Sequence, residues 1–133
     1  MKTEGALRPA GTRSTPWLRY IVIALVVEKI VQHVFVTAAF FFNWDDIAST
    51  VAVAPGALMV LGGAVAVLFG LSLWGLLARK SWATYLAIGL ALFDIVGEFV
   101  AQGKVGIVIT WSFLVAITLL IVTAAYRAGE ARE

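Results

Sequence analysis

Four long apolar runs constrain the fold of this chain more than any other feature of its sequence. They cover about residues 17–43, 56–78, 82–102 and 105–126. Each run is long enough to cross the hydrocarbon core of a bilayer as a helix, which takes roughly 20 residues. Apolar residues follow one another within each run and do not alternate with polar ones, so the pattern excludes the strands of a membrane barrel. We therefore predict four transmembrane helices.

The composition agrees with a membrane protein and excludes several other classes. Hydrophobic residues make up 62% of the 133 residues and charged residues only 14%, whereas a soluble domain carries about a quarter charged residues. The formal net charge of +2 is too small to indicate a nucleic-acid partner. Cysteine is absent, which excludes disulfides and thiolate chemistry. The sequence contains neither a Gly-rich phosphate loop nor an HExxH motif, so no motif indicates an enzyme.

The connections between the runs predict how the helices are arranged. The second and third connections are only a few residues long, which forces neighbouring helices to run antiparallel. We expect an all-α, up-down-up-down bundle over 17–126, preceded by a basic head (1–16) and followed by a short tail (127–133). In the longer 43–55 connection, Asp45 and Asp46 are expected to open a short helix that ends before Pro55.

The distribution of basic residues predicts the orientation in the membrane. Cytoplasmic loops of membrane proteins carry an excess of Lys and Arg. One side of the predicted bundle holds nearly all of these residues: Lys2, Arg8, Arg13, Arg19, Arg79, Lys80, Arg127 and Arg132. The opposite side holds only Lys104, and Lys29 lies within the first run. Both termini are therefore expected in the cytoplasm, with a prokaryotic cytoplasmic membrane as the location.

Small residues in the second run are expected to bring helices close together. Gly62, Ala66 and Gly70 follow one another at four-residue spacing, which places them on one face of a helix. In lipid, such a row lets two helix backbones approach closely. We interpret the row as a packing surface.

Six polar side chains interrupt the first and third runs, and they are the candidate functional residues. The first run carries Glu28, Lys29, Gln32 and His33, and the third carries Asp94 and Glu98. Both runs cross the membrane in the same direction, and Trp17 and Trp82 are taken as equivalent anchors at the interface. Lys29 then lies level with Asp94, and His33 with Glu98. Because an unpaired charge at this depth is costly, we expect the six residues to form one cluster.

The charges of this cluster suggest its chemistry. Three carboxylates and one lysine leave a surplus of negative charge, and like carboxylates in a low dielectric cannot all stay ionised. One carboxyl should therefore hold a proton or attract a cation. Glu98, level with His33, is the first choice for the proton carrier, since Asp94 is expected to be occupied by Lys29. We predict proton-linked or cation-linked binding or translocation of a small solute.

Other functions stay open at this stage. The charges could instead fix the register of the helices in a non-catalytic subunit or assembly factor of a larger membrane complex. A membrane enzyme or a protein that binds a pigment is a third reading. Glu28, His33, Asp94 and Glu98 could ligate a metal, although Lys29 beside them would repel the cation. The identity of any cofactor is open, and the expected partners are the lipid bilayer and either a second copy of the chain or other membrane subunits.

Overall fold

The chain is helical throughout the part that the structure describes. This computed structural model describes residues 16–102 and 110–132, and it contains no strand over these residues. The four long helices are α1 (Pro16–Phe42), α2 (Pro55–Leu77), α3 (Trp82–Gln102) and α4 (Trp111–Glu130), with a short 3-10 helix, η1 (Trp44–Thr50), between the first two. Each of the four long helices is long and apolar enough to cross a membrane. The predicted all-α class and the four apolar helices are thus confirmed.

The bounds of the first three long helices lie within one residue of the predicted ones. The fourth helix differs more, because Thr110 is its N-cap and its hydroxyl oxygen accepts a hydrogen bond from the Phe113 backbone N–H. At its other end α4 continues to Glu130, into the segment expected to form the tail. Residues 105–109 of the predicted fourth span and residues 1–15 of the predicted head lie outside the described residues.

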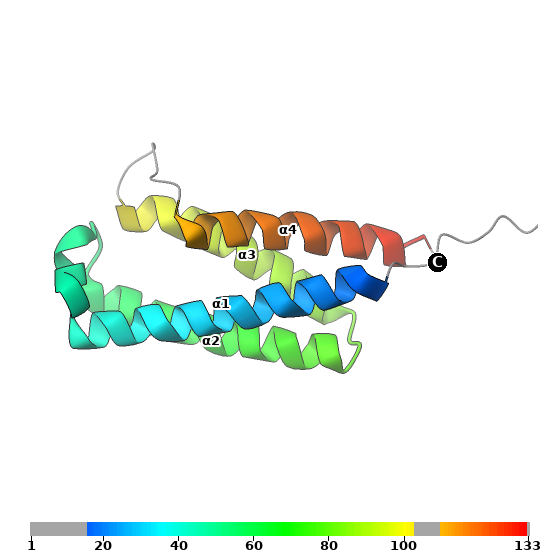
Figure 1. Ribbon diagram of the computed structural model, residues 1–133, viewed down its shortest axis with the longest axis horizontal. Helices are drawn as coiled ribbons and strands as arrows, with labels where there is room; N and C mark the ends of the chain where they lie inside the picture. Colours follow the sequence, from blue (N-terminus) through cyan, green and yellow to red (C-terminus); the bar gives the residue numbers. More distant parts are fainter. Residues whose placement is uncertain (1–15, 103–109, 133) are drawn as a thin grey trace, which may run out of the picture.

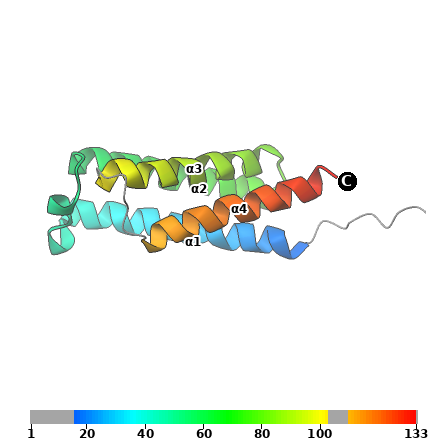
Figure 2. The same cartoon turned by 90° about the horizontal axis from the view of Figure 1, so that it is seen from above.

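The four long helices form an antiparallel ring, as Figures 1 and 2 show. Helix α1 packs against α2 and α4, and α3 packs against the same two helices. Helices α1 and α3 therefore face each other diagonally across the core. The start of α1, the α2–α3 turn and the end of α4 lie at one end of the bundle, and η1 lies at the other (Figure 1).

Each end of the bundle is tied by polar contacts. At the first end, Arg19 of α1 donates from Nη2 to the carbonyl of Leu76 at 2.9 Å, one of the last carbonyls of α2. At the other end, η1 contacts α1, and the backbone N–H of Ala52 donates to the carbonyl of Ala101 at the end of α3 at 2.9 Å. Asp45 and Asp46 lie in η1 with left-handed φ angles of 50° and 55°, a conformation that short polar side chains tolerate.

The core of the ring is built from small and branched apolar side chains. Buried residues from all four helices form it: Val22, Val26, Val65, Phe69, Leu76, Ala83, Ala87, Leu90, Ala91 and Leu119. Helix α3 contributes three alanines to this core, Ala83, Ala87 and Ala91. Many large apolar residues face outward instead, among them Val67, which is 72% exposed, and Trp111, which is 70% exposed.

Glycines differ in how closely other helices approach them. A Cβ atom at Gly62 would lie 2.9 Å from the Thr37 hydroxyl of α1, so this member of the predicted small-residue row does allow close packing. At Gly70 a Cβ atom would meet no described atom within 4 Å. The tightest approach lies outside the row, at Gly75, where a Cβ atom would lie 2.7 Å from the Ala83 Cβ.

We expect Gly75→Ala to lower the free energy of unfolding by about 1–3 kcal/mol, the usual effect of overpacking. The short Ala83 side chain cannot move aside without the helix that carries it. Gly70→Ala in the same helix is the matched control, and it should leave stability unchanged or raise it by about 0.5–1 kcal/mol, because alanine favours the helix. Unfolding in mixed detergent micelles, followed by circular dichroism, measures both. Equal effects of the two substitutions would contradict this packing.

Candidate functional site

Lys29 is fully buried in the core, and its ammonium group is surrounded by oxygen atoms. Its side chain has no exposed surface, and Nζ lies 2.9 Å from Asp94 Oδ2 on α3. It also donates to Gln32 Oε1 at 2.9 Å and to the carbonyl and hydroxyl oxygens of Ser112 on α4 at 2.9 and 3.2 Å. An ammonium group has three N–H donors, so these oxygens satisfy it completely.

Asp94 is shared between two basic side chains. While Oδ2 meets Lys29, the Nε2 atom of His33 lies 3.0 Å from Oδ1 and 3.2 Å from Oδ2. The Asp94 carboxyl is 7% exposed and the His33 side chain 16% exposed. The imidazole also stacks on Phe69 of α2, with ring centroids 5.7 Å apart. His33 is thus the member of this group that lies nearest the surface.

Helix geometry explains why these residues meet. Lys29 and His33 are four residues apart and lie on the same face of α1, so both side chains can reach one carboxylate. Gln32, three residues after Lys29, is also a neighbour on the helix surface. The long lysine side chain spans the diagonal between α1 and α3. We call Lys29, Gln32, His33, Asp94 and Ser112 the central cluster.

The depth alignment made from the sequence is confirmed for Lys29 and Asp94. His33 was expected to lie opposite Glu98, and the structure instead places its Nε2 atom on Asp94. The alignment compared the positions of residues along the two helices and not their angles around each helix. Because Lys29 and His33 share a face, they converge on the same acid.

Glu28 lies outside the central cluster, on the seam between α1 and α4. Its Oε1 atom accepts a hydrogen bond from Nε1 of Trp111 at 3.1 Å. Its Oε2 atom is buried and has no hydrogen-bond partner among the described residues. Trp111 is largely exposed, so its hydrogen bond with Oε1 lies at the outer edge of the α1–α4 seam, whereas Oε2 is enclosed within the seam.

The Glu98 carboxylate accepts a hydrogen bond from Thr110, the N-cap residue of α4. The Thr110 hydroxyl donates to Glu98 Oε1 at 3.1 Å while its oxygen accepts from the Phe113 N–H. Sequence reasoning missed Thr110, Trp111 and Ser112, each of which contacts a candidate residue. Thr110 and Ser112, on either side of Trp111, are polar residues in an otherwise apolar run, and this interruption was the available signal. The predicted span began at 105, so these residues were placed inside a helix and not at its start.

The six candidate residues therefore do not converge on one point. The central cluster holds Lys29, Gln32, His33 and Asp94, while Glu28 and Glu98 bind groups at the start of α4. Among the described residues, no three His, Asp or Glu side chains come together in a way that could hold a metal ion. The net charge of the central cluster is zero with a neutral His33 and +1 with a protonated one.

Comparisons with protein families, with curated proteins and with solved structures found no match to this chain. No relative therefore indicates an activity or a partner. Conclusions about function rest on the chemistry of the residues described above.

Replacing Lys29 should show how strongly the central cluster stabilises the fold. We expect Lys29→Met to lower the free energy of unfolding by about 3–5 kcal/mol, because it leaves the buried Asp94 carboxylate without its main counter-charge. The double variant Lys29→Met/Asp94→Leu should regain much of this loss. Lys80→Met, which removes an exposed lysine, is the control and should change stability by less than about 0.5 kcal/mol. Losses that simply add in the double variant would contradict the pairing.

Proposed function

We propose that the chain is an integral membrane protein with both termini in the cytoplasm. The outward-facing apolar side chains support insertion, because soluble proteins rarely expose such large contiguous apolar surfaces. The orientation is supported by the end of the bundle that carries Arg19, Arg79, Lys80, Arg127 and Arg132, since basic residues favour the cytoplasmic side.

Within this membrane protein, we propose that the central cluster takes up and releases a proton in the binding or translocation of a small solute. The observation that carries this proposal is the sharing of the buried Asp94 carboxylate between Lys29 and His33. Lysine already balances the carboxylate, so binding a proton at His33 adds an uncompensated charge to a low-dielectric site. A cationic or polar solute that approaches the same carboxylate would then compete with that proton.

His33 is the proton carrier in this mechanism, and not Glu98 as the sequence alone suggested. Imidazole is the side chain whose ordinary titration falls between pH 5 and 8. Its contact with Asp94 joins it to the buried carboxylate, and its partial exposure leaves a route for a proton. A single bundle of four helices leaves little room for a solute pathway, so we propose that translocation uses a homo-oligomer.

Proton movement through reconstituted protein tests this function. Liposomes loaded with a pH-sensitive dye and placed under a potassium diffusion potential should acidify faster with the protein than without it. His33→Gln should remove most of this increase, because glutamine can still donate to Asp94 but cannot titrate. Asp46→Asn, which changes an exposed carboxyl in η1, should behave like the wild type.

A second readout follows the proton directly. His33 is the chain's single histidine, so imidazole nitrogen resonances of ¹⁵N-histidine-labelled protein report this residue without assignment. Spectra are recorded in membranes from about pH 8 to about pH 5, and the proposed function requires both the neutral and the protonated imidazole to appear in this series. If His33 kept one neutral form throughout the series, the proton-linked function would be wrong.

A role as a subunit or assembly factor is the second candidate function, and one observation favours it. The Glu28 carboxyl lies on the α1–α4 seam, where Oε1 accepts from the largely exposed Trp111 and Oε2 is buried without a partner among the described residues. A buried oxygen without a donor is costly. A partner helix that packs on Trp111 and rearranges this seam would supply the missing donor. Co-purification of a second membrane protein that is lost in Glu28→Leu would support this role.

A further inference from the structure

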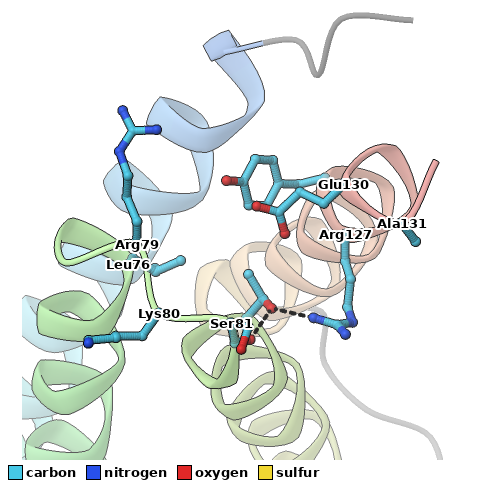
Figure 3. A pocket seen from close by; sticks show the side chains of 9 residues that line it. Leu76, Arg79, Lys80, Ser81, Arg127, Glu130 and Ala131 are labelled. Atoms are coloured by element: carbon cyan, nitrogen blue, oxygen red, sulfur yellow. Dashed lines mark hydrogen bonds between the residues drawn. The ribbon is translucent and has the colours of Figure 1, made fainter. Parts of the chain in front are cut away.

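A polar pocket opens at the end of the bundle where the α2–α3 turn meets the end of α4. Its volume is about 360 Å³, and Figure 3 shows the side chains that line it. Arg79 and Lys80 come from the α2–α3 turn, and Ser81 is the residue before α3. Thr84 lies in the first turn of α3, and Arg127 comes from α4. This pocket shares no residue with the central cluster.

Positive charge dominates the lining. Three basic residues, Arg79, Lys80 and Arg127, line the pocket together with a single acid, Glu130. The basic side chains point in different directions, and Lys80 is directed away from Glu130 (Figure 3). The structure pairs none of these three cations with a carboxylate among the described residues, since both recorded ion pairs lie at Asp94. Arg127 contacts neutral groups instead: it donates to the hydroxyls of Thr84 and Tyr85. The pocket thus carries cations that no carboxylate among the described residues neutralises, and arginine and lysine are donors that bind phosphate oxygens.

The backbone conformation at Arg79 is one that usually requires glycine. The N–H of Lys80 donates to the Gly75 carbonyl at 2.8 Å and the N–H of Arg79 to the Leu76 carbonyl at 3.2 Å, which is the Schellman pattern that ends a helix. The residue at the Arg79 position is usually glycine, because φ is positive there, and Arg79 has φ 56°. A non-glycine residue in this conformation costs about 1–2 kcal/mol. This unfavourable conformation occurs at Arg79, whose side chain lies at the rim of the pocket.

The surroundings indicate which phosphate compound would fit. The pocket lies at the end of four apolar helices, next to the aromatic side chains of Trp82, Tyr85 and Tyr126, which are typical of a membrane interface. Basic pockets between helices at this level suit lipid head groups. We infer that the pocket binds the phosphate of an anionic phospholipid in the leaflet at the basic end of the bundle.

Lipid binding to the purified full-length chain in mild detergent tests this inference. In native mass spectrometry, the wild type should retain phosphatidylglycerol in preference to phosphatidylcholine with the same acyl chains. Arg79→Gly should weaken phosphatidylglycerol binding about fivefold, which corresponds to about 1 kcal/mol for one cation. The same variant should unfold at an equal or higher temperature, since glycine relieves the positive φ. A merely structural role for Arg79 would give the opposite change in stability.

Arg132→Gly is the matched control, because it removes the same charge at the same end of the bundle without touching the pocket. It should weaken phosphatidylglycerol binding less than about twofold. Equal losses in the two variants, or no loss in Arg79→Gly, would overturn the site. Soluble glycerol 3-phosphate added in excess should not displace the lipid, which is also held by its acyl chains. Displacement by this anion would overturn the assignment to a lipid and point to a free phosphate compound.

Discussion

The buried ion pair between Lys29 and Asp94 is the interaction on which the rest of this structure depends. A lysine in the middle of an apolar bundle must find acceptors, because the cost of an isolated charge there far exceeds the free energy of ordinary packing. The carboxylate of α3 and the oxygens of Ser112 on α4 supply them. One ammonium group thereby fixes the rotation and depth of three helices relative to one another.

In the proposed function, the carboxylate that holds the helices together is also the group through which a proton acts on them. Asp94 accepts from His33 as well as from Lys29, so a change in the imidazole alters the charge at the point where α1 and α3 meet. A solute or proton that binds there would act on the contact that sets the helix arrangement. This coupling of stability and chemistry favours a proton-linked function over a purely structural one. The basic pocket at the end of the bundle is separate, since it shares no residue with the central cluster.

Several of these features follow from the sequence, and the others depend on angles that a sequence does not give. Unbroken apolar runs predicted the helices, and the positions of Trp17 and Trp82 gave the depth at which Lys29 meets Asp94. The contact of His33 required the angle of each side chain around its helix. Ser112 was missed because the start of α4 is decided by the Thr110 cap, which the apolar run conceals. Gly75 and Arg79 owe their roles to the shape of one turn, and only the folded chain shows that shape.

The most direct test of this account measures the distance between the Lys29 ammonium and the Asp94 carboxyl in a lipid bilayer. Magic-angle-spinning NMR of protein labelled with ¹⁵N at lysine Nζ and ¹³C at the aspartate carboxyl reports such pairs. We predict one strong dipolar contact, consistent with the 2.9 Å separation of Nζ and Oδ2, which disappears in Asp94→Asn prepared with the same labels. Absence of any lysine–aspartate contact in the wild type, or its persistence in that variant, would contradict the central role of this ion pair.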